Sequence, residues 1–170
     1  MDARYQERAA APPSGARNLR LQSHARISLR ALFLGVGSMP VRILIADDDP
    51  AIRRLFRRLL EAQPDWQVCG EAVNGLDAVE QVVQASPDLA ILDLGMPLMN
   101  GMEAAREISQ LNPALPLLLI SVQEMSDQLV EAAQKAGFKG AITKSRGREV
   151  VTGVEAVLHN RMFFDREELR

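Results

Sequence analysis

The sequence predicts an α/β protein whose core is a doubly wound, parallel sheet of five strands. From Val41 onward, short apolar runs alternate with amphipathic stretches of about 10 to 13 residues, which is the pattern that βαβ units require. Several of these runs, such as ILIA, LAIL and LLLI, contain no polar residue on either face. Strands of that kind are typical of parallel sheets that helices cover on both sides.

The five strands are expected at the short apolar runs, which are residues 41–46, 66–71, 88–93, 116–121 and 140–143. The second run contains Cys69, the single cysteine, so the chain cannot form an internal disulfide. A lone cysteine fits a reducing compartment. A buried structural thiol is more common in such a strand than a reactive one, so Cys69 is expected to be part of the packing.

Five helices are expected after the strands, at about residues 50–62, 75–85, 101–111, 126–136 and 147–159. Pro50 opens the first helix, because a proline in the first helical turn loses no backbone hydrogen bond. The second helix stops before Ser86-Pro87, since a residue that precedes proline avoids the helical region. The fourth helix has its N-cap at Ser126 and ends at Gly137, a residue suited to left-handed backbone.

The first helix is expected to be amphipathic. Its apolar stripe consists of Ile52, Leu55, Phe56, Leu59 and Leu60, and its opposite face carries Arg53, Arg54, Arg57 and Arg58. The apolar stripe is expected to pack against the sheet, which leaves the arginines on the outside.

The composition is that of an ordinary globular protein, with 47% hydrophobic residues, 25% charged residues and a formal net charge of −2. The overall charge gives no sign of nucleic-acid binding. Residues 1–40 differ from the rest, because they carry six arginines against two acidic residues and show no sustained period. Their apolar stretch, ISLRALFLGVGSM, is interrupted by Arg30 and is too short to cross a bilayer.

The composition and the expected helices and strands together divide the chain into three parts. We expect residues 1–40 to be a disordered leader, or an over-extended start with Met39 as the true first residue. A docked amphipathic helix and a targeting peptide are the alternatives for this part. Residues 41–160 form the expected domain, and residues 161–170 form a short tail.

Four of the predicted strands end in residues that suit a phosphate and metal site. The first run ends in Asp47 and Asp48, the third in Asp93, the fourth in Ser121 and the fifth in Lys144. In an open parallel sheet, ligands bind outside the carboxyl ends of the strands. These side chains are therefore expected to meet at one edge of the sheet.

Carboxylates on neighbouring residues repel each other unless a cation lies between them, and the oxygen ligands of Asp47 and Asp48 suit Mg²⁺. A helix cap with solvated neighbours is the simpler interpretation of the three consecutive aspartates, and Asp49 is expected to be that cap. Asp93 favours the metal site, because an uncompensated charge at the end of an apolar strand is costly. Beside a divalent cation, such a carboxylate can attack a phosphoryl group, with Lys144 and Ser121 bonding the phosphoryl oxygens.

Four motifs closely resemble the receiver domains of two-component response regulators, namely ILIADDDP, PDLAILDLGMPLMNGME, LLLIS and GFKGAITKS. They follow one another in the order and spacing of that family over about residues 41–160. Their spelling, together with the tail VLHNRMFFDREEL, is closest to the NarL/FixJ-type subfamily. The resemblance implies a flavodoxin-like or CheY-like (βα)5 fold.

The resemblance also implies a role for each strand-end residue and a partner for the chain. Asp93 is the implied phosphoacceptor. The implied ligands of Mg²⁺ are Asp47, Asp48, Asp93 and the backbone carbonyl of Gly95. Ser121 is the implied switch hydroxyl, and Lys144 is the implied contact to the phosphoryl group. The implied phosphoryl donor is a sensor histidine kinase. The arginines of the first helix are then either a docking surface for that kinase or simply a solvated face.

Two features depart from the family's pattern. Ala141 stands three positions before Lys144, where many receivers carry an aromatic residue, so the route by which the signal leaves the site is open. NarL/FixJ-type regulators usually continue into a helix-turn-helix domain, whereas this sequence ends at Arg170 without a candidate recognition helix. We therefore expect no direct nucleic-acid binding by the chain.

The expected function is a phosphorylation-dependent signalling switch that works in the cytoplasm, away from membranes, and can form a homodimer on phosphorylation. It is expected to be a phosphoacceptor rather than an enzyme. One alternative is a binding module that keeps the fold without phosphorylation. Another is the receiver part of a DNA-binding regulator whose output domain is absent from this chain. A phosphatase of the haloacid dehalogenase type is disfavoured, because Gly95 stands where that family needs a second aspartate.

Overall fold

The computed structural model describes residues 39–164 of the chain. The predicted leader therefore lies almost entirely outside the described residues, as does most of the predicted tail. Within the described part, a parallel sheet has the strand order β2-β1-β3-β4-β5-β6. The strands are β1 (Val41–Ala46), β2 (Trp66–Ala72), β3 (Leu89–Asp93), β4 (Leu117–Ser121), β5 (Phe138–Thr143) and β6 (Phe163–Phe164).

Helices follow the strands in the alternation that the sequence predicts. They are α2 (Pro50–Glu61), α3 (Gly75–Ala85), α4 (Gly101–Leu111), α5 (Asp127–Ala136) and α6 (Val150–Leu158), with a 3₁₀ helix, η1 (Lys144–Glu149), before the last. The doubly wound fold is therefore confirmed, and its first five strands occupy the predicted positions to within a few residues. None of the described helices is long and apolar enough to cross a bilayer.

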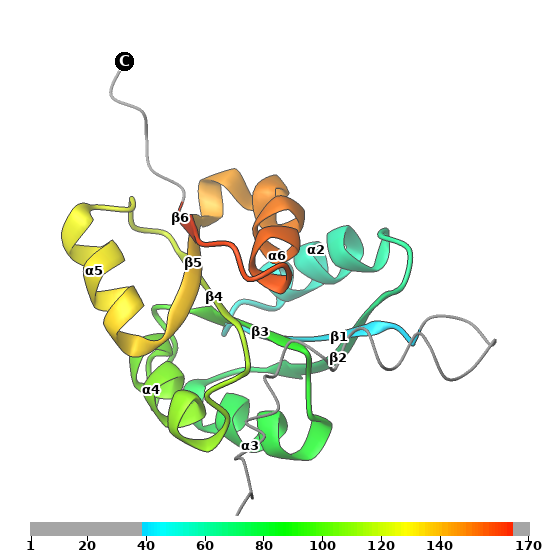
Figure 1. Ribbon diagram of the computed structural model, residues 1–170, viewed down its shortest axis with the longest axis horizontal. Helices are drawn as coiled ribbons and strands as arrows, with labels where there is room; N and C mark the ends of the chain where they lie inside the picture. The colour runs from blue at the N-terminus through cyan, green and yellow to red at the C-terminus, as the bar shows by residue number, and fades with distance from the viewer. Residues whose placement is uncertain (1–38, 165–170) are drawn as a thin grey trace, which may run out of the picture. The chain divides into compact units, whose positions relative to one another are not determined.

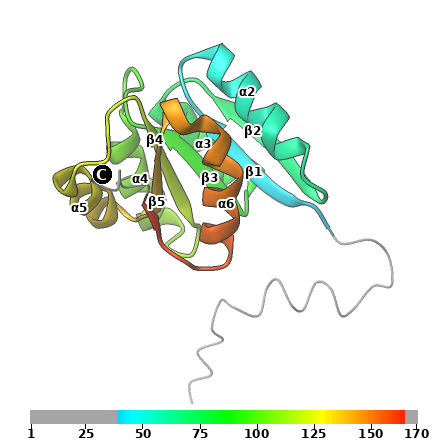
Figure 2. The ribbon, with the colours of Figure 1, turned by 90° about the horizontal axis from the view of Figure 1, so that it is seen from above.

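The helices divide between the two faces of the sheet (Figures 1 and 2), so that each face has its own apolar core. On one face, α2 and α6 pack against the strands, with Phe56 and Val154 among the buried residues. On the other face, α3, α4 and α5 pack against the strands, with Ile108 and Val130 among the buried residues. Because both faces are covered, β1, β3 and β4 are apolar along almost their whole length.

Local capping interactions explain where the helices begin and end. The side chain of Asp49 accepts a hydrogen bond from Ala51 N–H and caps α2, as predicted. Asn100 and Glu103 form a reciprocal capping box at the start of α4. Ser126 caps α5, which ends at Gly137 with a φ of 106°. Each of these helices therefore begins at a capping residue in its own sequence, and α5 also ends at one.

The structure corrects the prediction for the last part of the domain. The expected helix at 147–159 begins as the 3₁₀ helix η1, and regular α-helix starts only at Val150. A sixth strand, β6, pairs with β5 in parallel, and the sequence did not predict it. The two-residue strand is too short to show a period of its own.

Two predicted packing positions also differ. Leu55, expected in the buried stripe of the first helix, is 42% exposed. Cys69 is only half-buried, at the point where the register of β1 with β2 shifts by one residue. Burial still raises the pKa of its thiol, which makes a reactive thiolate less favourable.

The arginine face of α2 is only partly a solvated surface. Arg53 is 14% exposed and pairs with Glu71 of β2 at 3.1 Å. Arg57 pairs with Glu71 at 2.7 Å and with Glu61 at 2.8 Å. Arg54 and Arg58 are exposed. Two of the four arginines therefore fasten α2 to the edge strand, and two face outward.

Candidate functional site

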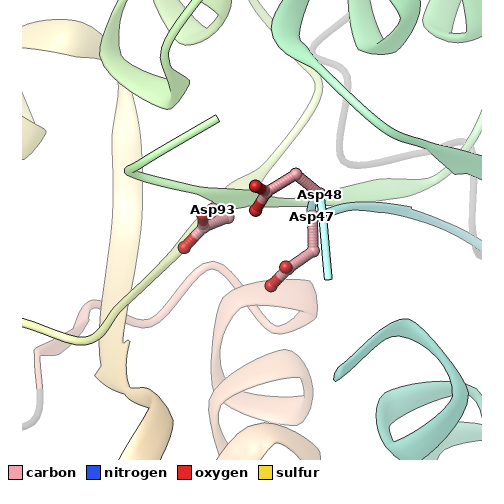
Figure 3. Close-up of side chains that lie close together, drawn as sticks. All are labelled: Asp47, Asp48 and Asp93. Atoms are coloured by element: carbon pink, nitrogen blue, oxygen red, sulfur yellow. The ribbon is translucent and has the colours of Figure 1, made fainter. Parts of the chain in front are cut away.

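The carboxyl ends of the strands bring the predicted acidic residues together, as Figure 3 shows. Carboxylate oxygens of Asp47, Asp48 and Asp93 all lie within 4.8 Å of one another. β1 and β3 are direct neighbours in the sheet, so the residues that follow or end them share one edge. The same edge receives Ser121, which pairs in register with Thr143, the residue before Lys144.

Asp47 is fully buried at the base of this cluster. Its Oδ1 accepts a hydrogen bond from Asp49 N–H at 2.9 Å, and its Oδ2 lies 2.8 Å from Lys144 Nζ. The ammonium group of Lys144 therefore compensates the buried Oδ2. Burial raises the pKa of this carboxyl above its ordinary value of 3.8, and the nearby Asp93 adds to the rise.

Lys144 neutralises part of the acidic cluster. Its Nζ lies 2.8 Å from Asp47 Oδ2 and 3.0 Å from Asp93 Oδ1, and its side chain is 13% exposed. Burial alone would lower the pKa of the ammonium group, but the bonds to Asp47 and Asp93 outweigh burial and raise it. Lys144 is therefore a fixed positive charge shared by two carboxylates.

Asp93 faces a hollow of about 210 Å³ at the edge of the sheet. The hollow is lined by Asp48, Asp93, Leu94, Gly95, Ser121, Val122, Gln123 and Lys144. The Oδ2 of Asp93 accepts a hydrogen bond from Gly95 N–H at 3.1 Å, and its Oδ1 faces Lys144. The carboxylate is thus oriented on both sides and still borders an open space.

Ser121 lines the same hollow as the acidic cluster and is buried. Its Oγ accepts a hydrogen bond from Gln123 N–H at 2.9 Å. The bond holds the turn that follows β4 against the strand end. A group that drew the hydroxyl toward Asp93 would have to loosen this turn.

The residues fit a divalent metal ion of the hard, oxygen-binding kind. Three carboxylates lie together, one of them fully buried, and the ammonium group of Lys144 pairs with only two of them. Mg²⁺ is commonly held by one or two carboxylates with water or phosphate completing its shell. Asp47, Asp48 and Asp93 therefore offer a suitable donor set, to which Gly95 lies close enough to be a candidate.

Sequence reasoning missed two residues that shape the site. Arg53 donates to the backbone carbonyl of Asp47 at 2.7 Å, which fixes the turn between β1 and α2. Gly101 lies against the backbone of Asp93, where an added Cβ would overlap the Asp93 carbonyl oxygen. The Asn100-Gly101 pair marks a helix start in the sequence, but the close approach depends on the fold and leaves no local signal.

Comparison with known proteins points to one family. The response regulator receiver domain family matches residues 43–154. A two-component response regulator of the LuxR family from Aurantimonas sp. SI85-9A1 has a TM-score of 0.69 and 33% identity, over 73% of this chain and 89% of that chain. The signal receiver domain of the putative response regulator NarL from Mycobacterium tuberculosis has a TM-score of 0.67 and 31% identity, over 72% and 99% of the two chains.

A curated relative belongs to a different kind of protein. It is a protein-glutamate methylesterase/protein-glutamine glutaminase of Pyrococcus abyssi, 37% identical over 102 residues. The match covers 60% of this chain but only 27% of the relative. The chain thus spans about a quarter of the relative's length, and the comparisons agree on the receiver domain without settling a subfamily.

Proposed function

The chain belongs to the response regulator receiver domain family, and from this premise we propose that Asp93 accepts a phosphoryl group from a sensor histidine kinase. The observation that carries the proposal is the setting of this carboxylate. Asp93 is 4% exposed, borders the hollow, and is held by Lys144 and by Gly95 N–H. A phosphoryl donor can reach it through that hollow.

The proposed reaction is a phosphoryl transfer from nitrogen to oxygen. A carboxylate oxygen of Asp93 forms a bond to phosphorus while the N–P bond of the donor's phosphohistidine breaks. The imidazole nitrogen keeps the electron pair, so the donor returns to neutral histidine after taking up a proton. Such transfers depend mainly on positioning and charge neutralisation, which is what this small site offers.

Lys144 and Ser121 would bond the oxygens of the transferred group. Lys144 Nζ already lies 3.0 Å from Asp93 Oδ1, so its ammonium can follow the added charge with little movement. Ser121 borders the same hollow, and its hydroxyl can donate once it leaves the turn that it holds at Gln123. These two residues would therefore distinguish the phosphorylated from the free state.

Asp47, Asp48 and Asp93 are the residues that would hold Mg²⁺, with the carbonyl of Gly95 as the proposed backbone ligand. When bound, the ion would offset the negative charge of the phosphoryl oxygens and of the carboxylates. Asp47 Oδ2, buried beside one ammonium, is the strongest sign that a second cation belongs here.

The remaining parts of the proposal concern partners and output. We propose a cytoplasmic signalling protein of the NarL/FixJ-type subfamily that forms a homodimer when phosphorylated and does not itself bind nucleic acid. Its role is that of an acceptor which assists its own phosphorylation and hydrolysis. The methylesterase similarity does not argue for esterase activity, because the match covers only 27% of that relative.

Phosphorylation by a small donor tests the proposal directly. The full chain with acetyl phosphate and Mg²⁺ should gain the mass of one phosphoryl group, and Asp93→Asn should gain none. Asp65→Asn is the matched control, because Asp65 is exposed at the opposite end of the sheet and its positive φ suits asparagine. A phosphoryl group that persists in Asp93→Asn would refute the assignment of the acceptor.

A second candidate is a receiver-fold binding module that works without phosphorylation. It is favoured by Ala141, which is buried in β5 where many receivers carry an aromatic residue. The same mass measurement separates the two functions. No gain in the wild-type chain would favour the binding module, whereas a gain that depends on Asp93 would exclude it.

A further inference from the structure

The strand β6 completes the edge of the sheet beside the residues that would sense the phosphoryl group. Phe163 pairs with Gly140 and Phe164 with Ala141, both in β5. Side chains of neighbouring strand residues point to opposite faces of a sheet. Accordingly, Phe163 packs against the core beneath α2 and α6, and Phe164 packs against the core beneath α3, α4 and α5.

Two glycines make room for Phe163. A Cβ at Gly140 would collide with the carbonyl oxygen of Phe163 at 2.5 Å, and one at Gly153 of α6 would lie 2.7 Å from Ile142 of β5 and 3.3 Å from the ring of Phe163. Glycine lowers the stability of a helix relative to alanine. The close packing around Gly153 explains why a glycine nevertheless occurs in α6. Gly140 therefore allows β6 to approach β5, and Gly153 lets α6 pack closely on β5 beside Phe163.

Phe164 lies in a row of residues that leads to the phosphoacceptor site. Leu119, Ala141 and Phe164 all belong to the core beneath α5, on three adjacent strands. Ser121 lies two residues after Leu119 in β4, and Thr143 lies two residues after Ala141 in β5. Ser121 and Thr143 pair in register and point to this same face of the sheet. This face of the sheet therefore leads from β6 to Ser121, and Lys144 follows Thr143 directly in the chain.

We propose that phosphorylation of Asp93 tightens the pairing of β6 with β5, through inward movement of Phe164 over Ala141. The inference rests on the proposed function and adds the structural change by which phosphorylation would be passed on to the rest of the domain. It assigns the signal to a C-terminal strand in place of an aromatic residue within β5.

The direction in which Phe164 would move follows from the space on the face of the sheet that carries Ser121, Thr143 and Ala141. In the structure described, Ser121 accepts a hydrogen bond from Gln123 N–H, and Phe164 is only partly buried. When the hydroxyl turns toward a phosphoryl oxygen, volume opens beside Thr143 and Ala141. The methyl group of Ala141 is too small to fill this volume, whereas the ring of Phe164 gains burial by moving into it.

Hydrogen exchange of the full chain tests the coupling, with beryllofluoride and Mg²⁺ as the phosphoryl mimic. The amides of Phe163 and Phe164 should exchange at least about 5-fold more slowly with the mimic than with Mg²⁺ alone, in the range of ordinary allosteric couplings. Because coupling is reciprocal, Phe164→Ala should weaken the binding of beryllofluoride by a similar factor. Met162→Ala is the matched control, since Met162 adjoins β6 and is exposed.

The outcomes separate this inference from the function on which it rests. If the wild-type chain binds beryllofluoride but the exchange of β6 is unchanged or faster, the coupling is refuted and the proposed function stands. If Phe164→Ala binds the mimic as tightly as Met162→Ala does, the coupling is refuted as well. If the wild-type chain neither binds the mimic nor accepts a phosphoryl group from acetyl phosphate, both proposals fail.

Discussion

At the residue scale, the site is defined by an imbalance of charge. Three carboxylates lie within 4.8 Å of one another, and one ammonium group serves two of them. Asp47 has the least favourable setting, because it is fully buried and its pKa is raised by desolvation. The site therefore favours the binding of a further cation, and Lys144 offsets part of the negative charge of the carboxylates when that cation is absent.

Replacement of Lys144 should expose this imbalance. In Lys144→Met the two carboxylates lose their cation, so the free energy of unfolding without Mg²⁺ should fall by about 3 kcal/mol, as for other broken buried ion pairs. Mg²⁺ should restore part of the loss and should stabilise the variant more than the wild type. Urea unfolding with Mg²⁺ and with a chelator measures both effects.

Lys139→Met is the control for the loss of a lysine, taken from β5, the strand that ends just before Lys144. Lys139 is exposed in β5, outside the ladder of pairs with β4, so its replacement should change stability by only a few tenths of a kcal/mol. An equal response of the two variants to Mg²⁺ would contradict the idea that Lys144 and the metal ion share the same carboxylates.

At the scale of elements, α2 is fastened to the edge strand β2 by a shared carboxylate. Glu71 accepts from Arg53 at 3.1 Å and from Arg57 at 2.7 Å. Burial acts to raise the pKa of Glu71, but the bonds to the two arginines outweigh it and hold the pKa below its ordinary value of 4.5. Since Arg53 also donates to the carbonyl of Asp47, this link positions the acidic turn as well as the helix.

Glu71→Gln should therefore reduce stability in a pH-dependent way. A lowered pKa in the folded state gives stability that is fully present above the unfolded value and is lost as pH falls through the folded value. The variant should be less stable by about 1 kcal/mol at pH 7, and the difference should shrink below pH 4.5. Urea unfolding across this range measures it.

Glu131→Gln provides the control, because Glu131 pairs with Lys135 on the exposed surface of α5. Its loss should change stability much less at pH 7. If both variants lose the same stability, or if the Glu71 difference grows in acid, the link between α2 and β2 does not contribute as described.

The elements show which parts of the fold can be predicted from sequence and why. Helices with side-chain caps, such as α2 and α5, begin and end within a residue of prediction, because their signals are local. The acidic pair, Asp93 and Lys144 were also predicted to meet, because the rule of parallel strand ends needs only the order of strands. By contrast, β6 depends on Gly140 and Gly153, which are distant in sequence, and the Arg53 bond to Asp47 depends on helix rotation.

At the scale of the whole described domain, the helix that follows the acidic turn carries exposed basic side chains. Arg54 and Arg58 are exposed on α2, next to the 42% exposed Leu55. Gly147 of η1 packs against Phe56 of the same helix, so η1, which begins at Lys144, adjoins this surface. If a phosphohistidine donor docks on this surface, the positive charge of the arginines would speed its approach.

Charge reversal separates docking from chemistry. In Arg54→Glu with Arg58→Glu, phosphotransfer from the partner kinase at low salt should slow by about 10-fold or more, because electrostatic steering is lost. Phosphorylation by acetyl phosphate should be unchanged, since neither residue lines the hollow.

Arg57 is left in place because it pairs with Glu71. Arg106→Glu with Arg161→Glu, also exposed, reverses the same charge elsewhere and should leave the kinase rate nearly unaltered. Equal slowing by both pairs would mean that net charge governs the encounter, and loss of both reactions in the first pair would mean that α2 serves the site itself.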